Sequence, residues 1–482
     1  MRVLERFQVV WHNVRLTNNN RYRGCQFLSH EEAHLLLPAD SAWLALERPE
    51  NPMTITVMLR VDDLTPERLR DFLQHYWLAW DRFRFMPVQR SPGWWWEPDP
   101  TFNLDHHLET VPGTFSEAEL RAWVSARLNQ ALPDYRPRWK FWLVPGAEDG
   151  AALLLRIHHC YADGLSLLGI FEQTCPPSPQ QAPVRYGARE QGDLGRWKRS
   201  VGIWLDTFLN SGHGEDLESI GGERSSLERL THHGLRLVNE LSQFLIESED
   251  TPSQLKRPLL GRRSCSWSSP LALERFRSVA DRMGCTINDV LLSCVAAAVR
   301  ACLEEHGDSL DESIMHAAMP VSIRDRMPEG ICPQDGGLGN FFGTVFVPLP
   351  VDGDSPLERL FRVKHETRRL KKSWQPGISW GLAGTASLLP QGVLQSVANM
   401  MYRKASAVVS NVPGLKEPRY IAGCRIREQM FWVPQAGNIG LGISVISYAG
   451  QVQFGVVADE AVLPEPELFL AHCLAELDRF PL

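Results

Sequence analysis

The residues best suited to chemistry lie in the stretch His158-His159-Cys160-Tyr161-Ala162-Asp163-Gly164, where Asp-Gly follows two histidines after three residues. An apolar run over 151–157 precedes the histidines and has the length and composition of a buried strand. The pair therefore lies where a strand runs out into a loop, a common position for working side chains on a rigid scaffold. Neighbouring side chains in an extended chain point to opposite faces, so one histidine can face a cleft while the other packs behind it.

Asp163 and Gly164 follow closely enough to shape this loop. We expect Asp163 to orient the turn and Gly164 to adopt a backbone angle that other residues resist. Two more histidine pairs, His106-His107 and His232-His233, lack the Asp-Gly sequence and serve as internal comparisons. We interpret them as a strand surface and a helix surface, so the pattern favours catalysis only at 158–164.

A histidine without a nucleophile motif is best suited to act as a general base. The sequence contains no GxSxG. Cys160 is an alternative nucleophile, but its side chain is expected to point to the face opposite that of His159. A neutral imidazole could deprotonate an alcohol for attack on an activated acyl donor such as a thioester, and such help is typically worth about 10²–10⁴-fold in rate.

The surrounding pattern predicts the elements that must position this stretch. A strand over 54–59 and a hairpin of 141–145 with 151–157 would hold the histidines. Capping residues Ser116 with Glu119, and Thr286 with Asp289, predict the starts of two helices. The remaining expected helices cover 41–46, 66–84, 273–283 (ended by Gly284) and 466–480, and the remaining strands cover 315–323, 344–349, 407–409, 439–447 and 452–457.

Strands and helices are mixed in both halves of the chain, which predicts an α/β fold of two layered domains joined by a crossover. The expected organisation is an N-terminal extension over 1–33, an N-terminal domain over 34–175, a linker over 176–258 and a C-terminal domain over 259–482. The linker is rich in proline, glycine and charge, and residues 227–245 within it predict an amphipathic helix.

Composition narrows the function classes. The net charge of −7 gives no case for a nucleic-acid partner. Ten cysteines without a CxxC pair argue against a zinc site or a disulfide framework and are typical of a reducing cytosol. No segment reaches the roughly 18 uninterrupted apolar residues of a spanning helix. The run Trp94-Trp95-Trp96 fits strand packing, or else a surface that meets lipid.

From about residue 38 to 482 the sequence resembles the bacterial wax ester synthase/diacylglycerol acyltransferase family, within the larger group of CoA-dependent acyltransferases that share HHxxxDG. Besides that motif, the resemblance rests on Asn51-Pro52-Met53, Asp105-His106-His107, Thr286 to Val290, Pro320 to Arg324, Gly339-Asn340 and Ser410 to Gly414. Two departures stand out. Pro137-Arg138-Trp139 replaces the usual Pro-Leu-Trp, and the linker near Leu259-Leu260 lacks an expected asparagine.

The resemblance implies two similar domains with an active-site tunnel between them. His159 would be the base, and His158, Asp163 and Gly164 would support it. Asp163 would shape the loop through an arginine such as Arg324. Acyl-CoA would be a substrate, with no cofactor and no metal. The acceptor would be a fatty alcohol or diacylglycerol, and the enzyme would be cytoplasmic, in peripheral contact with a membrane or lipid inclusions.

Two further segments have a structural and a functional interpretation. Asn288 and Asp289 can simply begin a helix, or they can direct the positive end of that helix at the reaction centre. The segments Ser410 to Gly414 and Gly339-Asn340 read as turns first and as substrate contacts second.

Two rival functions share parts of this pattern. A condensation-type enzyme would use a carrier-bound donor and an amine acceptor, and a lipid-binding or droplet-coating protein would keep the fold without catalysis. The segments at 286–290, 320–324 and 410–414 favour the lipid enzymes over condensation, and the presence of both His159 and Asp163 favours catalysis over binding.

Overall fold

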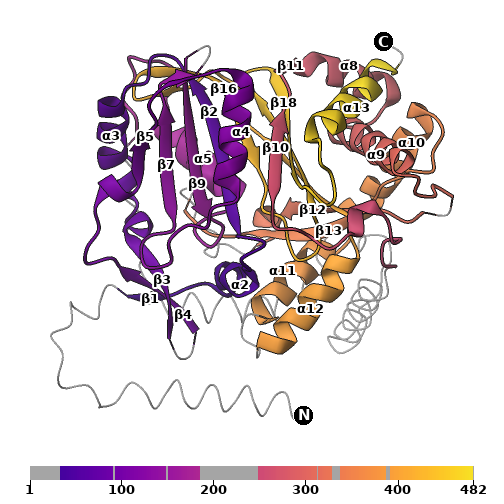
Figure 1. Ribbon diagram of the computed structural model, residues 1–482, viewed down its shortest axis with the longest axis horizontal. Coiled ribbons are helices and arrows are strands. Elements are labelled where there is room, and N and C mark those ends of the chain that lie inside the picture. The colour runs from indigo at the N-terminus through magenta and orange to yellow at the C-terminus, as the bar shows by residue number, and fades with distance from the viewer. Residues whose placement is uncertain are drawn as a thin grey trace, which may run out of the picture.

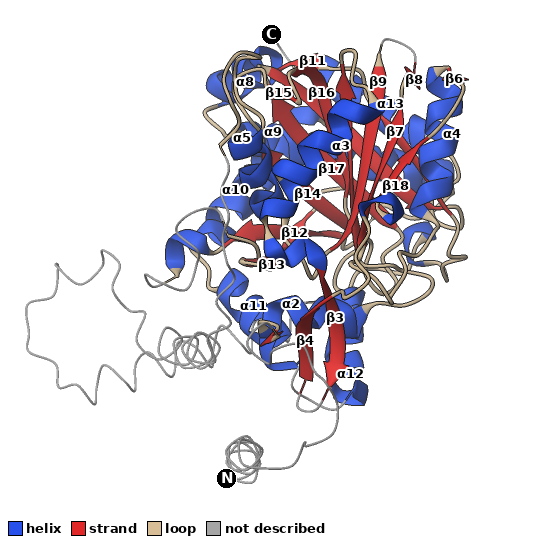
Figure 2. Ribbon diagram, turned by 90° about the vertical axis from the view of Figure 1, so that its left-hand side faces the viewer, coloured by secondary structure: helices blue, strands red, loops and turns tan. Residues whose placement is uncertain are grey.

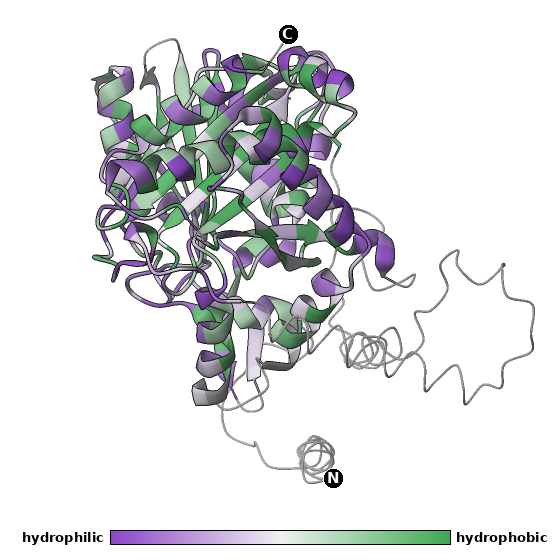
Figure 3. Ribbon diagram, turned by 90° about the vertical axis from the view of Figure 1, so that its right-hand side faces the viewer, coloured by the Kyte–Doolittle hydropathy of each residue, from purple (hydrophilic) through white to green (hydrophobic). Residues whose placement is uncertain are grey.

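Two β-sheets lying side by side form the frame of the molecule, with helices on their outer faces (Figure 1). The computed structural model describes residues 33–90, 93–147, 150–184, 248–311, 313–327, 337–386 and 391–480. Over these ranges the chain is a mixed α/β fold, as the alternation of patterns predicts. The strands carry mostly hydrophobic residues, whereas the helices mix hydrophilic and hydrophobic residues (Figure 3).

The first sheet holds the strand that ends in the histidine pair. Its order is β15 (Tyr420–Ile421), β16 (Cys424–Trp432), β2 (Thr54–Val61), β9 (Ala151–His158), β7 (Trp139–Val144) and β5 (Leu108–Thr110). The antiparallel pairing of β7 with β9 confirms the predicted hairpin. Every residue of β9 is buried. The histidine pair therefore ends a rigid, central strand.

The second sheet comes from the C-terminal half. Its order is β10 (Arg263–Trp267), β18 (Gln451–Asp459), β17 (Leu441–Tyr448), β14 (Ala407–Pro413), β12 (His316–Ser322) and β13 (Phe342–Pro348), and β11 (Leu271–Ala272) also pairs with β18. The strands β12, β14 and β17 run parallel, and the other pairs are antiparallel. The smaller sheets are β1 (His34–Leu35), β4 (Gly93–Pro98) and β3 (Phe85–Arg90), and β6 (Thr114–Phe115) with β8 (Gly146–Ala147).

The helices fall into two groups. The outer helices are α3 (Pro66–His75), α4 (Glu117–Leu128), α5 (Gly164–Thr174), α8 (Leu273–Met283), α9 (Ile287–Glu305), α10 (Pro356–Lys371) and α13 (Pro466–Asp478). A separate cluster of α2 (Pro38–Leu46), α11 (Gln375–Ala386) and α12 (Gln391–Arg403) lies together below the sheets (Figures 1 and 2). Short 3-10 turns cover Trp77–Ala79, Asp81–Arg84, Leu104–His106, Gln254–Lys256 and Arg324–Arg326.

The local sequence rules succeed at the helix caps. Ser116 and Glu119 form a reciprocal capping box at α4, and Thr286 and Asp289 form another at α9. Gly284 ends α8 in the left-handed conformation. These predictions are confirmed.

The predicted helix over 66–84 is wrong beyond its first half. The helix α3 ends at His75, and two 3-10 turns follow. Trp77 and Phe83 are buried and stack on each other with ring centroids 3.9 Å apart. Burial of these large rings in one core outweighs the helical spacing that the sequence shows.

The two halves interlock. The strands β15 and β16 come from the predicted C-terminal domain over 259–482 but lie in the first sheet, where β16 pairs with β2. Strand pairing therefore joins the two halves instead of leaving them as separate bodies. The predicted extension over 1–33 and the helix over 227–245 fall almost entirely outside the described residues.

A search of the described residues for membrane-spanning helices finds no single helix of sufficient length and apolarity. The pair α8 and α9, bent by 100°, passes together on length and composition alone.

Candidate active site

An apolar cavity of about 470 Å³ lies where the two sheets and the lower helix cluster meet. This is within the usual size range of small-molecule sites. Its walls come from α2, β12, β13, β14, α11, α12 and the loop after β9. Most lining side chains are apolar, and the polar ones include His159, Asp163, Arg324, Asn340 and Asn411. The cavity is therefore suited to an apolar substrate with one polar reacting group.

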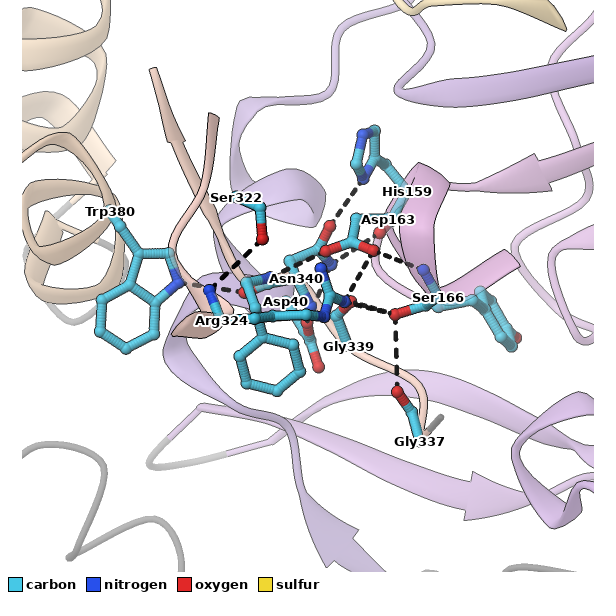
Figure 4. Close-up of polar contacts among 12 residues, drawn as sticks. Asp40, His159, Asp163, Ser166, Ser322, Arg324, Gly337, Gly339, Asn340 and Trp380 are labelled. Atoms are coloured by element: carbon cyan, nitrogen blue, oxygen red, sulfur yellow. Dashed lines mark hydrogen bonds and ion pairs between the residues drawn. The ribbon is translucent and has the colours of Figure 1, made fainter. Parts of the chain in front are cut away.

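His159 follows the last residue of β9 and faces this cavity. Its backbone N–H donates to the Met53 carbonyl over 2.7 Å. Its imidazole stacks on the Trp43 ring, with centroids 4.0 Å apart and planes inclined by 11°. The Nδ1 atom lies 2.8 Å from the side-chain oxygen of Asn340 (Figure 4). Because that oxygen can only accept, Nδ1 carries the proton and Nε2 is left as the basic nitrogen.

Burial keeps this base in its neutral form. Removal from water lowers the pKa of His159 to about 4, although hydrogen bonds to its own carbonyl and to Asn340 and the charge of Asp163 oppose the change. A histidine with this pKa is almost wholly unprotonated at neutral pH and can accept a proton.

The activity should therefore survive at low pH. A base must be unprotonated to work, so we expect kcat/KM to stay level down to about pH 5 and to fall tenfold per pH unit only below about 4. A pH series with folding monitored by circular dichroism at each point is the measurement. An acid limb near 6.5, the ordinary histidine pKa, would show that His159 is not buried in this way.

His158 packs behind the site. Its Nδ1 accepts from the Cys160 backbone N–H over 3.1 Å, and its Nε2 lies 3.4 Å from a carboxylate oxygen of Glu47. Burial lowers the pKa of His158. Arg138, at the position where the family resemblance led us to expect leucine, also pairs with Glu47, at 2.8 Å. Arg138 thus forms an ion pair beside His158 and does not line the cavity.

Asp163 ties the loop to the C-terminal half. One of its oxygens accepts from the Ser166 backbone N–H at the start of α5 and from Arg324 Nη2, both over 2.8 Å. The other accepts from the Phe341 N–H over 3.0 Å (Figure 4). The expected contact with Arg324 is present, and both residues line the cavity.

Gly164 has a different role from the one predicted. Its φ is not positive, and it begins α5 with helical geometry. A Cβ added there would lie 3.5 Å from Val412, an ordinary van der Waals distance. Neither the backbone angle nor the available space therefore requires glycine at this position.

Asn288 and Asp289 do not line the cavity. Asp289 caps α9 and accepts from the Thr367 hydroxyl over 2.6 Å. Asn288 accepts from Asn411 over 3.2 Å, and Asn411 itself does line the cavity. Asp289 therefore has a structural role at the start of α9. Asn288 contacts the cavity-lining residue Asn411 but does not reach the cavity itself.

Cys160 is fully buried in the core, away from the cavity lining, and burial raises the pKa of its thiol well above the ordinary value. His159 lines the cavity and Cys160 does not, but both lie in the turn after β9, where the alternation of an extended strand no longer holds. The interpretation of His106-His107 as a strand surface is wrong. His106 ends a 3-10 turn, and His107 is buried and donates from Nδ1 to the Trp139 carbonyl over 2.8 Å. His232-His233 lies outside the described residues.

Sequence reasoning undervalued Asn340 and missed Trp43. Gly339 has φ +146°, a value that glycine adopts readily, and it brings Asn340 against His159. The sequence analysis singled out the Gly339-Asn340 pair but interpreted it first as a turn and did not predict its contact with His159. Trp43 lies in the short predicted helix over 41–46. No local pattern there predicts its stacking on His159, which lies 116 positions later in the chain.

Comparisons with known proteins agree with this geometry. The wax ester synthase/diacylglycerol acyltransferase catalytic-domain model matches residues 36–291, and the C-terminal domain model of the same family matches 338–480. A protein of Mycobacterium tuberculosis (strain CDC 1551 / Oshkosh) that carries the name diacylglycerol O-acyltransferase is 30% identical over 383 residues, covering 76% of this chain and 77% of its own length.

Two more relatives extend the match along the chain. The O-acyltransferase WSD of Acinetobacter baylyi is 24% identical and covers 92% of this chain and 96% of its own. The solved wax ester synthase/diacylglycerol acyltransferase of Marinobacter aquaeolei VT8 has a TM-score of 0.63 at 21% identity, covering 92% of this chain and 98% of that one, which shows a shared fold. The chain therefore belongs to the wax ester synthase/diacylglycerol acyltransferase family and is an acyltransferase.

Proposed function

We propose that this enzyme transfers a long acyl chain from acyl-CoA to the hydroxyl of diacylglycerol or of a fatty alcohol, with His159 as the general base. The observation that supports this most directly is the buried imidazole itself. Its Nδ1 is engaged by Asn340, and the residue lines an apolar cavity of about 470 Å³. The name of the Mycobacterium tuberculosis relative supports diacylglycerol, and the description of the family supports both acceptors.

The proton moves in a closed cycle. The acceptor hydroxyl gives its proton to Nε2 of His159 as its oxygen bonds to the thioester carbonyl carbon. The carbon–sulfur bond then breaks, and the imidazolium returns the same proton to the leaving thiolate of CoA. No covalent acyl-enzyme is needed, and the low pKa of His159 favours return of the proton to sulfur.

The reacting group of the acceptor distinguishes this function from a condensation-type one, because the proposed enzyme acylates a hydroxyl and a condensation-type enzyme acylates an amine. Hexadecanol and hexadecylamine have the same chain and differ in the reacting group, so they can compete for one labelled acyl-CoA. We expect ester to dominate. Amide as the main product would replace the proposal by amine acylation.

The size of the cavity should set the accepted chain length. Ala398 on α12 is buried and lines the cavity, whereas Asn399 beside it is exposed and does not. We expect Ala398→Phe to lower turnover of a 16-carbon substrate about tenfold or more while an 8-carbon substrate changes little, because the added ring fills the cavity. Comparing both chain lengths in Ala398→Phe and in Asn399→Phe is the test. Equal losses for the two chain lengths would refute the role of the cavity.

We further propose that the enzyme works at the cytoplasmic surface of a membrane or lipid inclusion, without a resident cofactor or metal. Triacylglycerols and wax esters are too apolar to leave into water, which favours release into a lipid phase. Flotation of the purified protein with lipid vesicles tests the surface contact. Protein that remains unbound at every lipid composition would contradict it.

A further inference from the structure

Asp40 is a buried carboxylate that the expected chemistry does not use. It lies in the first turn of α2 and is completely inaccessible to solvent. One of its oxygens accepts two hydrogen bonds from Asn340, from the backbone N–H over 3.0 Å and from side-chain Nδ2 over 2.8 Å (Figure 4). Arg82 lies beside the other oxygen, at 3.7 Å. This carboxylate is therefore fixed from both sides.

The contacts of Asn340 define which way its amide faces. Nδ2 donates to Asp40 and also to the His159 carbonyl, over 2.8 Å in each case. A carboxylate and a carbonyl can only accept, so the nitrogen of the amide must be on that side. The amide oxygen then faces Nδ1 of His159, which must carry a proton in order to donate. Asn340 is itself 3% exposed, so water does not compete for these bonds.

We propose that Asp40 is a positioning residue that acts through Asn340 to hold His159 in the tautomer with Nδ1 protonated and Nε2 free for catalysis. This inference rests on the proposed role of His159 as the base. Without Asp40, the Asn340 amide could turn over and present its NH₂ group to Nδ1. The imidazole proton would then move to Nε2, and the cavity would face a donor where it needs an acceptor.

Asp163 does not perform this task. Its two oxygens are taken by Ser166, Arg324 and Phe341, and it makes no hydrogen bond with the imidazole among the described residues. The carboxylate that orients the base thus comes from α2, more than 100 positions before the histidine pair. The carboxylate inside the HHxxxDG motif ties the loop to the second half of the chain.

The expected loss of kcat on removing Asp40 lies below the loss seen when a directly bound acid is removed. Loss of the correct tautomer costs about 10⁴-fold in kcat in serine-protease triads, where the acid touches the histidine directly. Asp40 acts one residue further away, and the His159 backbone carbonyl also attracts the Nδ1 proton. Outer-shell partners of metal-bound histidines, which fix the tautomer in the same way, are typically worth about 10–100-fold in metal affinity or activity, and we expect an effect of this size.

The first test is kinetic. We expect Asp40→Leu, which keeps the number and branching of the side-chain atoms and removes the acceptor, to lower kcat by about 10–100-fold with KM nearly unchanged, because the tautomer affects the chemical step. Asp250→Leu is the matched control. Asp250 is also buried and accepts from a histidine Nδ1, that of His316, over 2.7 Å, but His316 does not line the cavity as His159 does. An equal loss of kcat in both variants, or no loss in Asp40→Leu, would overturn the proposal.

The tautomer itself can be observed without any reaction. In protein labelled with ¹⁵N-histidine, the His159 signals are those that disappear in His159→Gln. We expect a protonated Nδ1 and a bare Nε2 at pH 7, and a shift toward the opposite tautomer in Asp40→Leu. A protonated Nε2 in the native protein would refute the inference. Because this measurement needs no turnover, it separates failure of the inference from failure of the proposed acyl transfer.

Discussion

Replacing His159 with alanine should abolish nearly all acyl transfer while leaving the fold intact. We expect kcat to fall by about 10²–10⁴-fold, the typical contribution of a general base. The side chain faces a cavity and stacks on Trp43, so its removal leaves no buried charge unpaired. Steady-state kinetics with saturating acyl-CoA and acceptor measure the effect.

His158→Ala is the neighbouring comparison. His158 lies behind the site, against Glu47 and the Cys160 backbone, and does not line the cavity. Its loss should reduce stability more than it reduces kcat. If His158→Ala destroyed catalysis and His159→Ala retained it, the assignment of the base would be reversed.

Replacing Asp163 with alanine should have the second-largest effect, on stability and activity together. The change removes the carboxylate partner of Arg324, the N-cap of α5 and the acceptor of the Phe341 N–H. The ion pair is partly buried, and Arg324 keeps its hydrogen bond to Ser166. Loss of the ion pair, the cap and the buried acceptor together should cost about 3 kcal/mol in the free energy of unfolding. The site should also loosen, because these bonds hold the loop of His159 against the segment that carries Asn340.

Glu476→Ala provides the control for that prediction. Glu476 forms a buried pair with Arg359, with oxygen–nitrogen distances of 2.6 and 2.9 Å, between α13 and α10. Neither residue lines the cavity. Both variants should lose stability in chemical denaturation, but only Asp163→Ala should lose kcat under conditions where each remains folded. Full activity in folded Asp163→Ala would mean that the loop needs no such anchor.

Local patterns were enough to predict the frame around the histidine pair. Alternation and flanking turn residues identify β2, β7 and β9, and the capping residues identify α4 and α9, because each of these signals acts within a few residues. His159 lines the cavity and Cys160 lies in the core, as expected, although both residues lie in a turn and not in the strand from which this was predicted. Reasoning from local patterns failed over 77–84, where the packing of Trp77 on Phe83 overrides helical spacing.

The polar contacts of the site could not be predicted in this way. Asp40, His159 and Asn340 are far apart in the chain, and they meet only because α2 and the segment before β13 close on the end of β9. The pairing of β16 with β2 in the first sheet likewise joins segments that are far apart in the chain. No local period or motif encodes such meetings, which follow from how complete sheets and helices pack.

The measurement that tests the central claim most directly is product formation from labelled palmitoyl-CoA. The purified native protein would be given hexadecanol and a diacylglycerol in parallel, and the lipid products would be separated and counted. The account predicts labelled wax ester or triacylglycerol, formed in step with free CoA. Palmitoyl-CoA that binds to the protein but yields no ester with either acceptor would contradict it.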